Sequence, residues 1–251
     1  MTAPAIRLDD VSVAYGRHLA VRRVSGVFAP GSLTAIAGPN GAGKSTLLRA
    51  LMGEVPLASG AIDSAGLPSR AMAYLPQAAA IDRSFPISVA DAVLGGAWRR
   101  LGALRGASAD IAAKARQALA SVGLEGFGSR AVGALSAGQF QRVLFARLLL
   151  QDAAVVLLDE PFTAVDARTT EDLLVLIEGW RREGRTVIAV LHDLDQVRAH
   201  FPQTLLLARE AIAWGPTGEV LSPLNLVRTR AAAERWDEAR DRAPVLAGAA
   251  R

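Results

Sequence analysis

The sequence predicts an α/β fold in which a mainly parallel sheet is interrupted by an inserted helical lobe. Residues 33–37, 153–158 and 186–191 are apolar runs with the length of buried strands. Helical spacing separates the last two runs, and such alternation of strands and helices is typical of a parallel sheet covered on both faces. Residues 89–150 are instead rich in alanine, leucine and arginine with helical spacing, which predicts a lobe of helices.

The chain begins with strand signals. Residues 6–15 alternate between apolar and polar side chains, and a slip at Asp9 and Asp10 indicates a bulge or bend. After the first helix, a turn leads into short strands near residue 62 and at residues 71–75. These segments precede the helical lobe and belong to the same core.

The rest of the chain carries clear start and stop signals. Ser108 and Gly123 are a typical start and stop of a helix within the lobe. Residues 204–207 and 211–214 predict a final hairpin. The tail, residues 228–251, mixes alanine with charges of both signs, and it could be a helix, a partner contact or disordered.

Composition excludes several classes of site and protein. The 251 residues include no cysteine, which excludes disulfides, thiolate metal sites and thiol catalysis. No uninterrupted apolar run reaches the roughly 18 residues that span a bilayer, and residues 1–10 lack a signal-peptide pattern, so we expect a cytosolic protein. The net charge is only +4 and basic residues cluster in pairs such as Arg22 and Arg23, so no nucleic-acid partner is expected.

A glycine-rich stretch, GPNGAGKST, lies between a predicted strand and a predicted helix, as a phosphate cradle requires. It matches the P-loop pattern, in which backbone N–H groups and a helix N-terminus bind phosphate oxygens. The candidate nucleotide-binding residues in it are Gly38, Pro39, Asn40, Gly41, Ala42, Gly43, Lys44, Ser45 and Thr46. Lys44 would reach the β- and γ-phosphates, and the Ser45 hydroxyl would bind Mg²⁺.

Two other interpretations of this loop are weaker. A glycine-rich turn without a ligand does not explain a full motif match between a strand and a helix. A dinucleotide-binding loop would need a third glycine where Thr46 stands. Lysine usage also favours phosphate, because Lys44 and Lys114 are the only lysines among 28 basic residues. In a chain that otherwise uses arginine, a lysine in this loop indicates a site that needs a compact ammonium group.

Polar residues follow the two later core strands. Asp159 and Glu160 follow the run at 153–158, and His192 follows the run at 186–191. Because ligands of parallel sheets bind at the carboxyl ends of strands, we expect these side chains to converge with the glycine loop. Asp159 would then hold Mg²⁺ through water, and Glu160 would orient or deprotonate the water that attacks the γ-phosphate. The alternative is that both acids only cap a strand end.

A second possible anion site precedes the helix that contains Phe140 and Val143. Ser136 and the small residues after it would expose backbone donors and the positive end of a helix dipole. Taken alone, Ser136 could be only a helix cap. Together with one nucleotide loop, a second phosphate-binding helix start indicates a nucleotide held by another copy of the chain.

The ordered set GPNGAGKST, Gln77, LSAGQ, VVLLDEP and His192 resembles the ATP-binding cassette (ABC) ATPases. The resemblance covers nearly the whole chain to about residue 220. It implies a P-loop NTPase (RecA-like) core with N-terminal antiparallel strands and an inserted α-helical subdomain. The corresponding division is a first core part at 1–88, the helical subdomain with the signature motif at 89–150, a second core part at 151–227, and a C-terminal tail at 228–251.

The resemblance also implies roles for single residues. Tyr15 would be the aromatic residue that stacks on adenine. Gln77 would be a catalytic residue and, with Ser45 and Asp159, a Mg²⁺ ligand, and it would link the Mg²⁺ site to a membrane partner. Glu160 would be the catalytic carboxylate and His192 the switch histidine. Asp166 would belong to the segment that crosses the dimer.

A head-to-tail homodimer that encloses two ATP molecules is implied as well. In it, the signature residues Ser136, Gly138 and Gln139 would bind the partner's nucleotide, with Ser136 and Gly138 at its γ-phosphate. One departure concerns Ala137, which replaces the first glycine of the LSGGQ-type signature. Its added methyl group would weaken the partner contact, and we expect the change to be tolerated.

Two stretches, at 82–95 and 160–167, resemble the zinc and manganese importer branch of this family. This implies an ATPase subunit on the inner face of the cell membrane that powers metal import through an integral membrane permease. A metal-binding solute-binding protein would be an indirect partner. Residues 82–95 would lie near the groove that receives a permease helix.

Other functions share the same nucleotide motifs. Within transport, the subunit could serve siderophore or haem uptake. A soluble cassette ATPase acting on DNA or ribosomes usually carries a coiled-coil insertion or two fused cassettes, and neither is found in this sequence. A nucleotide-binding scaffold without turnover is the third alternative, and Glu160 argues against it.

Overall fold

The computed structural model describes residues 3–68, 71–78, 81–98 and 108–241, with side chains described to residue 236. Its main sheet has six strands in the order β5-β6-β7-β3-β8-β9, and all neighbours are parallel except β8 and β9. These strands are β3 (Leu33–Ala37), β5 (Met72–Leu75), β6 (Val155–Asp159), β7 (Thr186–Val190), β8 (Gln203–Ala208) and β9 (Glu210–Pro216). The mainly parallel sheet predicted from the sequence is confirmed, as is the final hairpin.

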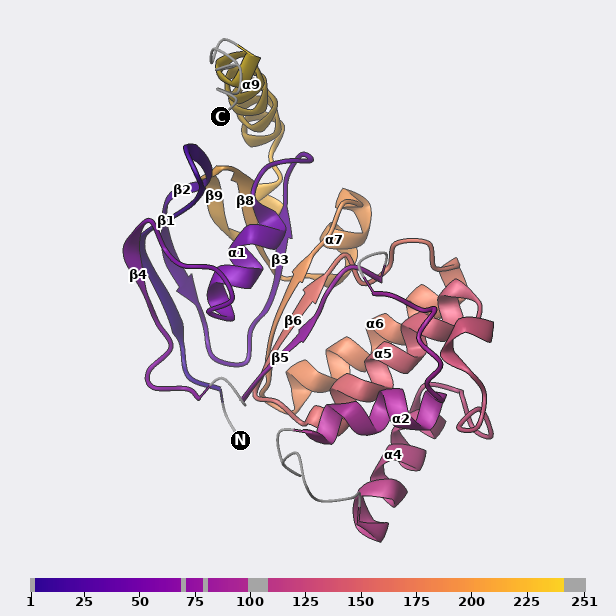
Figure 1. Ribbon diagram of the computed structural model, residues 1–251. Helices are drawn as coiled ribbons and strands as arrows, with labels where there is room; N and C mark the ends of the chain where they lie inside the picture. Colours follow the sequence, from indigo (N-terminus) through magenta and orange to yellow (C-terminus); the bar gives the residue numbers. More distant parts are fainter. Residues whose placement is uncertain (1–2, 69–70, 79–80, 99–107, 242–251) are drawn as a thin grey trace, which may run out of the picture.

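A second, antiparallel sheet lies beside the main sheet (Figure 1). It has the order β2-β1-β4, formed by β1 (Ile6–Tyr15), β2 (His18–Phe28) and β4 (Ser59–Asp63). The pairing of β1 with β2 shifts register between Leu8 and Val11, which confirms the predicted irregularity at Asp9 and Asp10. Helix α1 (Lys44–Leu51) buries Leu47 and Leu48 in the apolar cluster that joins the two sheets.

Alternation along the strands divides the core. On β6, Val155 and Leu157 pack in the cluster with α1, whereas Val156 and Leu158 pack in the cluster with the helices on the other face. Because successive strand residues point to opposite faces, one continuous apolar strand serves both clusters. The sheet therefore reads as unbroken apolar runs in the sequence.

The helical lobe inserted between β5 and β6 packs on the second face (Figure 1). Its elements are α2 (Val89–Leu94), η3 (Gly95–Ala97), α4 (Ala109–Ser121), η4 (Val132–Ala134) and α5 (Ala137–Gln151). Ser108 caps α4 by accepting a hydrogen bond from the Ile111 N–H, and Gly123 follows its end with φ +70°, as the sequence predicts. Helix α6 (Ala167–Arg182) packs Leu173, Ile177 and Trp180 into the same cluster.

The C-terminal part consists of α7 (Leu194–His200), α8 (Thr217–Val220) and α9 (Pro223–Asp241). Helix α9 stands at one end of the molecule beyond the hairpin β8–β9 (Figure 1). The tail expected from residue 228 is thus helical as far as Asp241, and the helix begins at Pro223, before the expected boundary at 227. Residues 242–251 of that tail lie outside the described part. No described helix combines the length and apolar character needed to cross a membrane.

Candidate functional site

The glycine-rich loop joins β3 to α1. Helix α1 starts at Lys44 without a side-chain cap, because the residue before it is Gly43, whose φ of 90° lies in the left-handed region. The first N–H groups of a helix have no partner within the helix. They are therefore available to an anion at this point, and the helix dipole adds to the attraction.

Two glycines allow this loop to pack against the core. A Cβ atom at Gly38 would collide with the carbonyl oxygen of Leu207, and one at Gly43 would collide with the carbonyl oxygen of Ala20. Both residues also have φ values that side chains rarely adopt. The glycines thus hold the loop between β8 and β2, and this fixes the direction of its N–H groups.

Lys44 is buried at the start of α1. Its Nζ donates to the carbonyl oxygens of Gly38 and Pro39, each at 2.9 Å, so the loop wraps around its own lysine. Burial lowers the pKa of Lys44 below its ordinary value, while the charges of Glu160 and Asp159 act in the opposite direction. A phosphate group in the loop would therefore bind an ammonium group that is already desolvated and is held in one direction by the two carbonyl oxygens.

Ser45 and Asp159 lie together behind the loop. The Ser45 hydroxyl donates to Oδ1 of Asp159 at 2.9 Å, and the Tyr74 hydroxyl donates to Oδ2 at 3.2 Å. Asp159 is 2 % exposed, and burial raises its pKa, opposed by these two hydrogen bonds. Two of the three oxygen ligands expected for Mg²⁺, Ser45 and Asp159, are therefore adjacent. Tyr74, on the neighbouring strand β5, is a contact that sequence reasoning missed.

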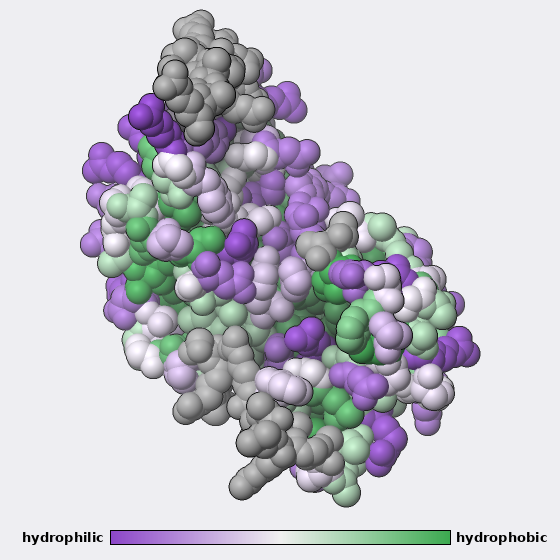
Figure 2. Space-filling view, in the orientation of Figure 1, coloured by the Kyte–Doolittle hydropathy of each residue, from purple (hydrophilic) through white to green (hydrophobic). Residues whose placement is uncertain are grey.

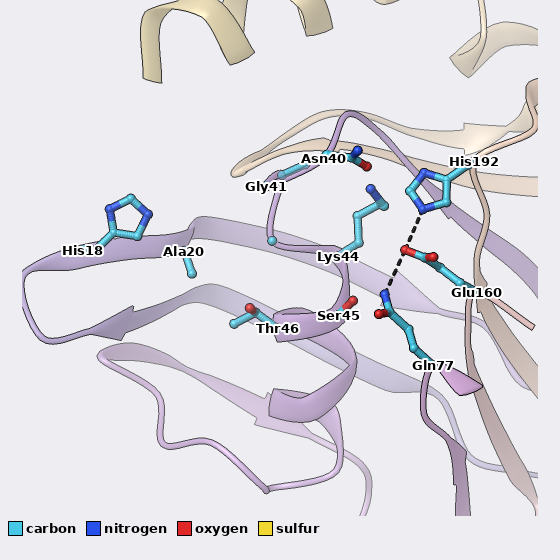
Figure 3. A pocket seen from close by; sticks show the side chains of 12 residues that line it. His18, Ala20, Asn40, Gly41, Lys44, Ser45, Thr46, Gln77, Glu160 and His192 are labelled. Atoms are coloured by element: carbon cyan, nitrogen blue, oxygen red, sulfur yellow. Dashed lines mark hydrogen bonds and ion pairs between the residues drawn. The ribbon is translucent and has the colours of Figure 1, made fainter. Parts of the chain in front are cut away.

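Glu160 lies at the centre of a second cluster (Figure 3). Its Oε1 accepts a hydrogen bond from Nε2 of Gln77 at 2.9 Å and lies 2.6 Å from Nε2 of His192. Thr163 donates to Oε2 at 3.3 Å. Glu160 and His192 follow β6 and β7, while Gln77 follows β5, so the expected convergence at the carboxyl ends of the strands is confirmed.

A cavity of about 820 Å³ connects these groups. Figure 3 shows Gln77, Glu160 and His192 on one side of it, His18 and Ala20 on the other, and Lys44 between them. The described residues that line it are His18, Ala20, Asn40, Gly41, Ala42, Gly43, Lys44, Ser45, Thr46, Gln77, Glu160 and His192. His18 lines the cavity without having been singled out from the sequence, where its position just after the turn that follows Tyr15 is the available signal.

Seven predicted site residues are not among those that line the cavity: Gly38 and Pro39 of the loop, Asp159 behind Ser45, and Tyr15, Ser136, Gly138 and Gln139. Tyr15 ends β1 with 46 % of its surface exposed. Ser136 and Gln139 form a capping box at the start of α5, in which each side chain accepts a hydrogen bond from the other residue's N–H. Tyr15 and these signature residues remain predicted binding residues, and Ser136 is in addition the helix cap that was its alternative interpretation.

Gly138 faces the segment after β6. A Cβ atom there would lie 3.4 Å from Oδ2 of Asp166 and 3.7 Å from Oγ1 of Thr169. Asp166 caps α6 by accepting from the Thr169 N–H at 2.9 Å, and the hydrogen bonds from Thr169 lower the pKa of Asp166. The signature and the segment expected to cross a dimer are thus neighbours within one chain.

Known proteins share this arrangement of motifs. The family model described as ABC transporter matches residues 21–163, which includes the glycine loop, Gln77, the signature and Glu160. The chain belongs to the ABC transporter family. As a member it is an ATPase, which binds and hydrolyses ATP.

Named relatives extend the match over most of the chain. The zinc transport system ATP-binding protein TroB of Treponema pallidum (strain Nichols) is 42% identical over 218 residues, 85% of this chain and 82% of TroB. The manganese transport system ATP-binding protein MntB of Bacillus subtilis (strain 168) is 39% identical over 228 residues, 89% of this chain and 91% of MntB. A structure described as an inward-facing conformation of a putative metal-chelate type ABC transporter has a TM-score of 0.81 at 28% identity, covering 92% of this chain and 90% of that chain.

Proposed function

We propose that this chain is the ATP-hydrolysing subunit of an importer for a divalent metal ion, zinc or manganese. The observation that carries the proposal is the convergence of Lys44, Ser45 and Glu160 at one edge of the sheet. The ions are inferred from the names of relatives such as TroB and MntB, which align with most of the chain. A siderophore or haem importer would share the cavity, so the cargo must be tested directly.

Within the cavity, each group has a proposed task. The Lys44 ammonium binds the β- and γ-phosphates, while the N–H groups of residues 40–46 bind phosphate oxygens. Glu160 orients and deprotonates the attacking water, and its contacts with Gln77 and His192 tie that carboxylate to two other strand ends. His192 would change its hydrogen bond when the γ-phosphate leaves. Tyr15 would stack on adenine.

The donor set also fits Mg²⁺, which prefers oxygen ligands. Ser45 offers a hydroxyl, Asp159 a buried carboxylate and Gln77 an amide oxygen. The bound ion would neutralise negative charge on the phosphate oxygens. The hydrogen bond from Ser45 to Asp159 supports this proposal, because it already holds two of the three groups together.

The active unit is proposed to be a head-to-tail dimer. Ser136, Gly138 and Gln139 lie outside the cavity of their own chain, as expected for residues that bind the partner's nucleotide. Asp166, next to Gly138, would cross between the copies. Each ATP would then be enclosed by the glycine loop of one copy and the signature of the other.

The dimer is proposed to sit on the inner face of the cell membrane against an integral permease, with a solute-binding protein as an indirect partner. Residues 82–95 are the proposed contact with the permease. Among them, Phe85 is an apolar residue with 65 % of its surface exposed, which suits a protein partner. Figure 2 shows apolar residues on the surface of the helical lobe. In the test, tagged chain is purified from membranes and cellular zinc and manganese are measured after deletion. We expect a co-purifying permease and loss of uptake of one ion. Recovery with DNA or ribosomes at physiological salt and no permease would favour a soluble ATPase.

A further inference from the structure

A buried amide connects the signature helix to the residue that follows Glu160. Gln141, on α5, is 1 % exposed, and its Nε2 donates to the carbonyl oxygen of Pro161 at 2.7 Å. Removing one partner of a buried hydrogen bond leaves the other without a partner, which lowers the free energy of unfolding. The contact thus defines the position of the Pro161 peptide relative to α5.

The backbone at this point adopts an unusual conformation. Glu160 has φ +51°, in the left-handed region, which is uncommon for a residue with a side chain. A following proline would favour extended backbone instead. The Glu160 N–H donates to the carbonyl oxygen of Val190 at 3.2 Å, and its carbonyl accepts from the Thr163 N–H at 3.3 Å. A strained residue at a reactive site persists only when its surroundings hold it there.

Arg142, which follows Gln141 on α5, holds the far end of the segment 160–166. Nη2 of Arg142 donates to Oγ1 of Thr169 at 3.1 Å and to Oδ2 of Asp172 at 2.8 Å. The Thr169 hydroxyl in turn donates to Oδ2 of Asp166 at 2.9 Å. Two consecutive residues of α5 therefore tether residues 160–166 at both ends.

We propose that Gln141 is a positioning residue for Glu160. By holding the Pro161 carbonyl, it keeps the strained Glu160 backbone in place and aims the carboxylate at the attacking water. This inference rests on the proposed role of Glu160 as the base. Gln141 lies about one helical turn from Gly138. If the start of α5 moves when the signature binds the partner's nucleotide, the hydrogen bond from Gln141 to Pro161 would pass that movement to Glu160.

The test replaces Gln141 by methionine, which has a similar length and flexibility but no N–H donor. The matched control is Gln117→Met on α4, where the side chain is exposed. Full-length variants are compared for kcat, ATP affinity and thermal midpoint, with kinetics measured well below the midpoint of each. Gln141→Leu is a second variant if the methionine variant does not fold. We expect kcat to fall at least fivefold with ATP affinity within twofold, and the control to match the original protein.

A purely structural role would lower only the thermal midpoint. A fall in kcat smaller than fivefold, or a loss of ATP affinity beyond twofold, therefore overturns the inference. Glu160→Gln is measured in parallel to separate the two proposals. Unchanged hydrolysis by Glu160→Gln would contradict the proposal that Glu160 is the base. An inactive Glu160→Gln together with a fully active Gln141→Met would contradict only the proposed role of Gln141.

Discussion

The hydroxyl of Ser45 and the carboxylate of Asp159, 114 residues apart in sequence, meet in a hydrogen bond of 2.9 Å. This contact joins the first turn of α1 to the end of β6, although β7 lies between β3 and β6 in the sheet. Tyr74 holds the second oxygen of the same carboxylate. Two hydrogen bonds thus fix the direction of this carboxylate, and such preorganisation lowers the ordering cost of binding a nucleotide.

A pH-dependence follows from the burial of Asp159. Its pKa is raised above the ordinary value, so the carboxyl takes up its proton at a higher pH than in the unfolded chain. Activity that needs the ionised form should fall as the pH drops through that raised pKa. Between the two pKa values the native state binds more protons, so this group's contribution to the free energy of unfolding increases as the pH falls.

Tyr74→Phe tests this assignment. The Tyr74 hydrogen bond favours the ionised carboxylate, so its loss should raise the pKa of Asp159 further and move the acid limb of the ATPase profile to higher pH. The quantity measured is kcat/KM for Mg-ATP as a function of pH, because kcat/KM reports the pKa values of the free enzyme. An acid limb that stays in place or moves to lower pH would contradict the prediction.

Lys44→Ala should weaken ATP binding at least tenfold, because a charge-assisted hydrogen bond of about 1.5–3 kcal/mol is lost. The matched control is Lys114→Ala, which removes the only other lysine, exposed on α4 and paired with Asp110 at 2.9 Å. Affinity is measured by titration with ATP. Equal affinities in the two variants would show that Lys44 does not bind the phosphates.

Trp236 should fasten α9 to the core beside the glycine loop. Its ring lies 5.2 Å from Cζ of Arg209 and 5.7 Å from Cζ of Arg22, and the Arg209 N–H donates to the carbonyl oxygen of Ala42 at 2.9 Å. Trp236→Ala should lower the free energy of unfolding by about 1 kcal/mol, from two cation–π contacts of about 0.5 kcal/mol each.

Denaturant unfolding measures this change. Trp98→Ala is the control, because Trp98 is 61 % exposed and should cost little. The proposed attachment would be ruled out if the two variants lost the same amount of stability.

Local signals account for what the sequence predicted well. The apolar runs that became β6 and β7 are followed by polar residues, and the run that became β3 is followed by the glycine loop. Parallel strands bring such ends together, so the meeting of Lys44, Glu160 and His192 could be derived from the amino-acid pattern. Caps such as Ser108 act over three residues and are visible in the same way.

Contacts between distant elements could not be derived. Tyr74 reaches Asp159 because β5 pairs with β6 in one register, and no periodicity reveals that register. Gln141 looks like any polar helix residue until its helix is placed against Pro161. The segment that forms α9 mixes charged residues with alanine and leucine in its sequence, so its apolar periodicity was too weak to predict where the helix begins.

Glu160 is the group on which ATP cleavage between two copies of the chain should depend most. Steady-state ATP hydrolysis by Glu160→Gln, together with its size in solution with Mg²⁺ and ATP, is the most direct measurement. Loss of a general base predicts a fall in turnover of about a hundredfold or more, unchanged ATP affinity and a stable ATP-bound dimer. Hydrolysis at the original rate, or a variant that stays monomeric with ATP bound, would contradict the proposal that Glu160 is the base for ATP cleavage between two copies of the chain.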